Sequence, residues 1–221
     1  MDSSTPHGYK LLLLCGVEES EGGNMNSTEI CNIALGSIGQ GRIDSMSEES
    51  EAARNCKLYY DLTRKNLLSM YPWEFAHRNT KLALLDKETP GWRFTYAYPA
   101  GALVIRKVYD MPFAHQKDDG NPAYTVIAIN ESQKAICANI ENAYCDYTFD
   151  VENAGIFPAT FVQALAYSLA AALSYPLSRS MDMQQVNYQL AQNAIQQAKY
   201  TSAIQDEHKP SYPHRYIDAG L

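Results

Sequence analysis

Residues that could bind a metal or act in catalysis are scattered along this sequence. It contains five cysteines and five histidines. A transition-metal site built from a local motif places such ligands a few residues apart, as in C-x-x-C or H-x-x-x-H pairs, and neither spacing occurs. We therefore expect no metal site and no cofactor, and we expect the cysteines to be reduced, buried thiols.

Neighbouring acidic residues are the next candidates, because glycoside hydrolysis needs two carboxylates flanking the scissile bond. Three pairs occur, at an expected helix start, in a turn and near the C-terminus. These are Glu48-Glu49, Asp118-Asp119 and Asp206-Glu207. All three positions favour a solvated surface, so we predict no catalytic residue and no enzymatic activity.

Nucleophile and phosphate-binding motifs are also absent, since the sequence has no G-x-S-x-G, H-E-x-x-H or P-loop pattern. The chain does contain sixteen tyrosines, which favour a protein interface. Tyrosines can also line a carbohydrate groove. A glycan hydrolase with an unrecognised carboxylate pair is therefore the alternative function.

The composition excludes two broad classes of protein. The chain has 18 basic and 25 acidic residues and a net charge of −7, whereas a protein that binds DNA by neutralising phosphates is normally basic. No apolar run approaches the ~18 residues of a membrane-spanning helix, although 46% of the residues are apolar, enough for a buried core. Residues 1–24 lack the apolar stretch of a secretion signal, and we expect them to form an N-terminal extension or arm.

Hydrophobic periodicity predicts the elements that position these side chains. Apolar residues recur at helical spacing over residues 30–38, 47–70, 158–174 and 181–204, which predicts four helices. Short aromatic and β-branched runs separated by turn residues fill residues 81–150, which predicts antiparallel strands. The interpretation is an α+β protein: a four-helix bundle with a small antiparallel β-sheet inserted between the second and third helices.

These elements divide the chain into parts. The parts are an N-terminal extension or arm (1–24), a helical bundle (25–80 and 151–205), a β-sheet insertion (81–150) and a C-terminal tail (206–221). Within the bundle, the third predicted helix is rich in alanine, and Leu165 and Leu169 follow one another on its apolar face. We expect both leucines to be fully buried.

An ordered series of short motifs runs through residues 28–203. The motifs are Ala34-Leu35-Gly36-Ser37-Ile38-Gly39-Gln40-Gly41-Arg42-Ile43, Glu51-Ala52-Ala53-Arg54, Tyr60-Asp61-x-x-Arg64, Leu68-x-x-Tyr71-Pro72-Trp73-x-Phe75-Ala76, Trp92-x-x-x-Tyr96-x-Tyr98-Pro99 and Phe157-Pro158-x-x-Phe161-x-x-Ala164-Leu165-x-x-x-Leu169-Ala170. In these motifs and in their order, the chain resembles the tail tubular protein A, or head-to-tail adaptor (connector), family of short-tailed bacteriophages.

The resemblance implies a structural virion protein without catalysis. Twelve such adaptors form a ring beneath the dodecameric portal protein, receive the tail nozzle (a tubular protein B-like partner) and leave a channel for double-stranded DNA. The implied partners are therefore further copies of this chain, the portal, the nozzle and DNA that passes without sequence-specific binding, with no membrane. The implied location is the virion tail below the portal vertex, and the host cytoplasm during assembly. Within this setting the alternative is a tail-associated glycan hydrolase.

The resemblance also places one turn at the junction of bundle and sheet. This turn contains Pro72, Trp73 and Phe75. Two interpretations of its aromatic rings remain open: they plug the core, or they contact a partner directly.

Two further groups are candidates for contacts within the assembly. Amide side chains line the polar side of the last predicted helix, which suits an inter-subunit face, a neutral lumen wall beside passing DNA, or a solvated surface. They are Gln185, Gln189, Gln192 and Gln196. The candidate docking tail near the C-terminus consists of Tyr212, His214, Arg215 and Tyr216.

Overall fold

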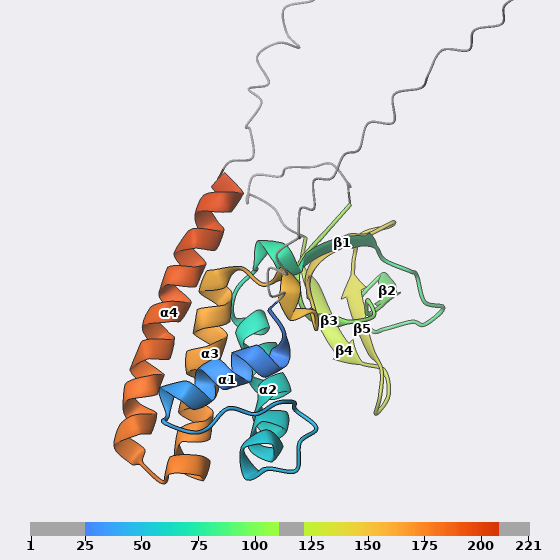
Figure 1. Cartoon of the computed structure of the whole chain (residues 1–221). Helices are drawn as coiled ribbons and strands as arrows, with labels where there is room; N and C mark the ends of the chain where they lie inside the picture. The colour runs from blue at the N-terminus through green and yellow to red at the C-terminus, as the bar shows by residue number, and fades with distance from the viewer. Residues whose placement is uncertain (1–24, 111–121, 208–221) are drawn as a thin grey trace, which may run out of the picture.

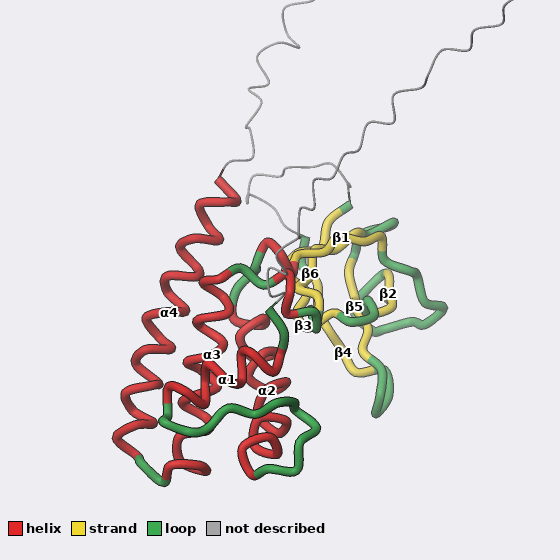
Figure 2. The backbone as a smooth tube through the Cα atoms, in the orientation of Figure 1, coloured by secondary structure: helices red, strands yellow, loops and turns green. Residues whose placement is uncertain are grey.

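The structure is a computed structural model that describes residues 25–110 and 122–207. Three expectations from the sequence lie outside these residues: the N-terminal extension, the acidic pair Asp118-Asp119 and the docking tail. Helices and strands occupy two separate parts of the molecule (Figure 2). The chain enters the helical part, crosses into the strands and returns to the helices.

Four α-helices make up the helical part, and they are α1 (Ser27–Ser37), α2 (Glu51–Met70), α3 (Ala159–Leu173) and α4 (Met181–Glu207). Asn26 begins α1 with a capping box, in which its side chain accepts from the backbone of Glu29. Ser50 begins α2, and its Oγ accepts from Ala53 N at 3.1 Å. The sequence placed this start earlier, at residues 47–49, but Glu48 accepts from Asp44 N and closes the preceding turn instead.

The strands form two antiparallel sheets of three strands each. The first sheet has the order β1-β6-β3 and the second β2-β5-β4. Their bounds are β1 (His77–Lys81), β2 (Phe94–Ala97), β3 (Ala102–Tyr109), β4 (Tyr124–Ala128), β5 (Lys134–Ala138) and β6 (Tyr144–Phe149). One buried cluster joins residues of both sheets, among them Val108 and Cys145 of the first and Tyr96 and Ile136 of the second. The two sheets therefore pack face to face.

The prediction of a four-helix bundle with one small inserted sheet is wrong. The structure is α+β with four helices and two three-stranded sheets. A four-helix bundle needs helices that run nearly parallel or antiparallel around a shared core. Here α3 is the central helix against which α1, α2 and α4 each pack, and the short α1 runs across α3 and α2 rather than alongside them (Figure 1).

The physical reason for this error is that periodicity identifies the buried face of an element but not its neighbours. The 3.6-residue pattern of α1 fixes which side is buried and leaves its crossing angle on α3 open. Short strands between turns likewise do not reveal whether they pair into one sheet or two. Both choices depend on contacts between residues that are distant in the sequence.

The core of the helical part centres on α3, as its alanine-rich sequence suggests. Leu165 and Leu169 are both 0% exposed, which confirms the expectation of full burial. They belong to the same buried cluster as Cys56 and Leu67 of α2 and Ile195 of α4. The four described cysteines are free and buried, as expected.

Candidate functional site

Trp73 lies in the short segment that leads from α2 to the strands, and it is a core residue. It is 2% exposed, and its indole Nε1 donates to Leu67 O at 2.8 Å. Its ring makes edge-to-face contacts with Tyr71 and Phe161, each with ring centroids 5.1 Å apart. This geometry favours the core-plug interpretation for Trp73, because both the apolar rings and the buried N–H are satisfied.

Phe75 and Pro72 have different surroundings from Trp73. Phe75 is half-buried and packs its ring against Phe161 of α3, with centroids 4.8 Å apart, and against Phe157, at 5.6 Å. Pro72 is exposed, and the extended backbone of Tyr71 before it ends α2. In the predicted turn, Trp73 is thus buried, Phe75 is partly accessible, and Pro72 is exposed where α2 ends.

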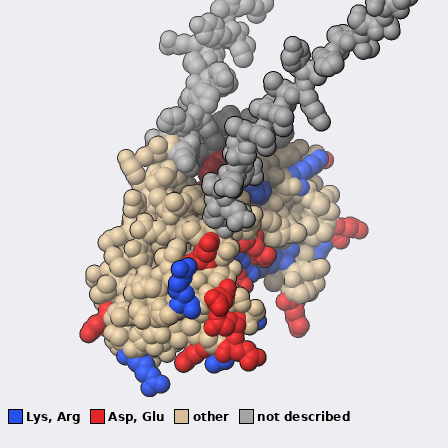
Figure 3. All heavy atoms as spheres, in the orientation of Figure 1, with Lys and Arg blue, Asp and Glu red and all other residues tan. Residues whose placement is uncertain are grey.

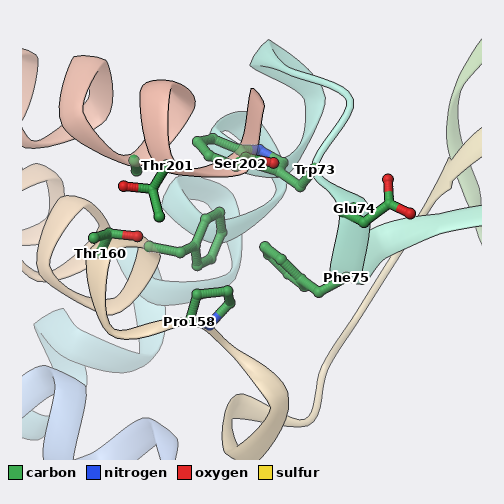
Figure 4. A pocket seen from close by; sticks show the side chains of 9 residues that line it. Trp73, Glu74, Phe75, Pro158, Thr160, Thr201 and Ser202 are labelled. Carbon is green, nitrogen blue, oxygen red and sulfur yellow. The ribbon is translucent and has the colours of Figure 1, made fainter. Parts of the chain in front are cut away.

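A pocket of about 250 Å³ opens beside these rings. It is formed by three segments that are distant in the sequence: the turn 73–75, the start of α3 and the last turns of α4 (Figure 4). Its apolar lining comes from Trp73, Phe75, Pro158, Phe161 and Ala198, and its polar edge from Glu74, Thr160, Thr201 and Ser202. An aromatic floor with a hydroxyl-bearing edge can bind an apolar or aromatic group that ends in a hydrogen-bonding atom.

The glutamines of α4 lie on the opposite side of that helix from its packed face. Gln185, Gln189, Gln192 and Gln196 are all exposed, while Asn187, Ala191, Ala194 and Ala198 are buried. Their spacing of four, three and four residues places the four amides on one stripe. The structure thus brings these four predicted residues together, and separates them from the pocket.

The exposed side of α4 carries almost no charge. No charged residue occurs from Met183 to Ala198, and the surface over α4 is correspondingly free of charged atoms over most of its length (Figure 3). Large apolar side chains are exposed among the amides, with Val186 57% and Leu190 40% accessible. We call the exposed side of residues 183–198 the α4 face. Long solvated helices normally present charged side chains there, so this composition suits a packing surface.

Buried Arg64 of α2 was missed as a functional residue by the sequence analysis, although it lies in one of the short motifs. It is 1% exposed, and its Nη1 donates to Asp150 Oδ1 at 2.6 Å and to Val151 O at 2.5 Å. Lys65 Nζ lies 3.2 Å from the other oxygen of Asp150. This ion pair joins α2 to the chain that leaves the last strand, 86 residues away.

Arg106 of β3 makes the reciprocal connection from the sheet to α2. Its Nη2 donates to Ser69 O at 2.9 Å and Tyr71 O at 3.0 Å, and its Nε donates to Thr148 Oγ1 at 2.9 Å. Burial lowers the pKa of the guanidinium from its ordinary value. A cation at the C-terminal end of a helix satisfies the last carbonyls and the helix dipole. Arg64 therefore ties α2 to the chain beyond β6, and Arg106 ties β3 to the end of α2, just before the turn 72–76.

A polar cluster on the first sheet also escaped the sequence analysis. Asp146 Oδ1 accepts from Tyr109 Oη and from Asn79 Nδ2, each at 2.8 Å, and lies 3.6 Å from His77 Nε2. Burial raises the pKa of Asp146, but hydrogen bonds from His77, Tyr109 and Asn79 outweigh it and leave that pKa below its ordinary value. Burial, together with Asp146, raises the pKa of Tyr109. The carboxylate stays ionised and the phenol protonated, which is a structural arrangement rather than one poised for proton transfer.

The register of the strands brings the residues of this cluster together. Asn79 lies directly opposite Asp146 in the β1–β6 pair, although the two residues are 67 positions apart. Nothing in their local sequence differs from that of other strand residues.

One carboxylate in each of the two larger surface hollows, of about 440 Å³ each, is bound to another group of the protein. One hollow contains Glu29 and Asp44, and Glu29 accepts from Asn26 N in the capping box of α1. The other contains Asp150 and Glu152, and Asp150 accepts from Arg64. In each hollow one acid is thus held by a structural contact.

The chain matches no protein-family model and no curated protein. Over residues 25–110 and 122–207, no helix is long and apolar enough to cross a membrane. In the same residues, no group of three or more His, Cys, Asp or Glu side chains could hold a metal ion.

Proposed function

We propose that this chain is a structural virion protein: a head-to-tail adaptor that forms a ring between a portal and a tail nozzle and serves as a conduit for DNA exit. The motifs that resemble the adaptor family supply the role. The structural observation that carries the proposal is the α4 face, a long exposed surface with amide and apolar side chains and no charge.

The α4 face supports contact with further copies of the chain. Exposed apolar residues such as Val186 and Leu190 gain from burial at an interface, and neighbouring amides such as Gln189 can hydrogen-bond across it without the desolvation cost of a charge. A ring requires that each copy present a patch to the next one. The twelvefold ring follows from the resemblance.

The charge of the chain agrees with a conduit for DNA. Each copy has a net charge of −7, so a ring of copies does not attract phosphates as a basic wall would. DNA can then pass without being held. The same charge opposes ring closure in solution, and we expect a mainly monomeric protein that assembles on the portal.

Nothing in the pocket favours glycan hydrolysis over the structural role. Of the residues that line it, Glu74 alone is a carboxylate, whereas glycoside hydrolysis uses two. Its volume of about 250 Å³ is also below the roughly 300–1,000 Å³ of small-molecule sites.

Native mass spectrometry of the full chain, with and without purified portal and at two salt concentrations, tests the proposal. We expect monomers alone and a complex with twelve copies of the chain when portal is present. No complex, or a different copy number, would contradict the ring.

A charge placed on the α4 face tests the observation itself. The double variant Gln189→Glu/Gln192→Glu changes the net charge by −2 and should abolish the complex, because it buries two unpaired carboxylates. Lys87→Glu makes the same charge change at an exposed position in the loop between β1 and β2, and it should assemble as the wild type does. Assembly of both variants would mean that the α4 face is plain solvated surface.

A further inference from the structure

The pocket at the helix–sheet junction has the dimensions and lining of a site for protein side chains. Three aromatic rings and Pro158 form its floor, and hydroxyls of Thr160, Thr201 and Ser202 stand at its edge. In Figure 4, Phe75 and Pro158 lie on one side of the pocket, and Thr160 and Thr201 lie on the other. Aromatic floors of this kind bind proline-rich segments, whose extended polyproline conformation lays proline and aromatic rings against them.

The pocket lies close to the end of α4. Ser202 is five residues before Glu207, the last residue of α4, and this separation corresponds to about 8 Å at 1.5 Å per residue. Fourteen residues, 208–221, follow the helix. Tyr212 is five residues beyond Glu207, and five extended residues span about 16 Å, enough for the chain to reverse and reach the pocket.

The composition of this following segment matches the pocket. It contains Pro210-Ser211-Tyr212-Pro213, a P-x-x-P sequence of the kind that adopts the polyproline conformation. Tyr212 supplies an aromatic ring with a terminal hydroxyl, which suits an apolar floor with hydroxyls at the edge. Lys209 and Arg215 flank these residues, and Glu74 is the acidic residue among those that line the pocket, although its carboxylate points away from the pocket in Figure 4.

We propose that residues 210–216 bind in the pocket of their own chain, with the ring of Tyr212 between Phe75 and Pro158 and its hydroxyl at Thr160, Thr201 and Ser202. The inference goes beyond the adaptor function and does not depend on it. It gives the aromatic turn 73–75 a binding role in addition to its place in the core.

Disulfide trapping in the full chain tests the proposal. The variant Ser202→Cys/Ser211→Cys, in a Cys15→Ser background, places one thiol at the edge of the pocket and one beside Tyr212. The matched control is Tyr200→Cys/Ser211→Cys, because Tyr200 is only two residues further from the helix end but is 71% exposed and is not among the pocket-lining residues. Both are oxidised with oxidised glutathione at low protein concentration, and the intramolecular disulfide is followed by mass spectrometry. If the Ser202→Cys variant shifts the thermal unfolding midpoint, Thr201→Cys replaces it.

We expect the disulfide in the pocket variant to form about tenfold faster than in the control, because binding raises the effective concentration of the two thiols. Adding Tyr212→Ala should bring the rate down to that of the control. Equal rates in the two double variants would overturn the proposal, and so would a rate that Tyr212→Ala leaves unchanged.

A mixture of the single variants Ser202→Cys and Ser211→Cys tests whether the pocket instead binds the tail of a second copy of the chain. Dimers that form there as fast as the intramolecular disulfide would assign the pocket to a second copy of the chain and overturn binding within one chain.

Discussion

The core between the helices differs from the core between the two sheets in the side chains that fill it. The helical core consists mainly of leucine, isoleucine and alanine around α3, with Leu165 and Leu169 at its centre. The smaller sheet core includes Tyr96 and Tyr147, and the hydroxyl of Tyr96 donates to Ile140 O. The helical part thus depends on close apolar packing, while the sheet part combines burial with hydrogen bonds from tyrosines.

The junction between the two cores combines aromatic rings with one buried and one half-buried arginine. Arg64 of α2 donates to Asp150 and Val151, just beyond β6, and Arg106 of β3 donates to the carbonyl of Ser69 in α2. A planar guanidinium donates in several directions at once, so one side chain can satisfy groups from two elements. The comparison predicts a large effect of mutations in the helical core, a smaller one at the junction and the smallest on the sheet.

The largest expected effect is in the helical core. Leu169→Ala should lower the free energy of unfolding by about 2–5 kcal/mol, because it removes apolar contacts and leaves a cavity in a region with little freedom to collapse. Denaturant titration followed by circular dichroism measures this change. Leu62→Ala is the matched control, since Leu62 is 58% exposed on α2 and should cost less than about 0.5 kcal/mol. A loss below about 1 kcal/mol for Leu169→Ala would remove α3 from the centre of the core.

At the junction, Arg64→Met should cost about 2–3 kcal/mol, because Asp150 and the carbonyl of Val151 lose a charged hydrogen-bond donor. The expected cost is lower than for a fully buried pair, since Asp150 is 16% exposed and keeps Lys65 nearby. Arg54→Met removes an arginine from an exposed position on the same helix and provides the comparison. Equal unfolding free energies for the two variants would show that the Arg64 ion pair does not stabilise the junction.

The helices and the α4 stripe could be predicted from the sequence because both depend on local spacing. The steps of four, three and four that place Gln185, Gln189, Gln192 and Gln196 on one face hold for any α-helix. The alanine-rich pattern of α3 likewise identified Leu165 and Leu169 as core residues without knowledge of their partners. The amide stripe of α4 and the apolar face of α3 depend on helical spacing alone and not on how the helices pack.

The pocket and the polar junction could not be predicted because their residues come from distant segments. Phe75, Pro158 and Thr201 meet only after α3 and α4 have packed against the turn that follows α2. Arg64 lay in a recognised motif, yet its partner Asp150 is 86 residues away. The pairing of six short strands into two sheets likewise depends on contacts between residues that are far apart in the sequence. Local pattern does not encode which distant partner a strand or a side chain will find.

The smallest expected effect is on the sheet, at Asp146, and it depends on pH. The pKa of Asp146 is below its ordinary value in the folded protein, so its ionised form stabilises the fold at neutral pH, and this contribution is lost as the pH falls through the folded pKa. Asp146→Asn keeps the shape and the hydrogen-bond acceptor but removes the charge. The variant should lower the free energy of unfolding by about 1 kcal/mol at pH 7. This difference from the wild type should shrink below about pH 4, where the unfolded wild-type carboxyl becomes protonated.

Urea titrations of both proteins between pH 7 and pH 3 measure the difference, and the same titrations of Asp110→Asn, just beyond the end of β3, provide the control. A difference that stays constant over this range would mean that the charge of Asp146 does not stabilise the sheet, and that Tyr109 and Asn79 need only an oxygen acceptor there.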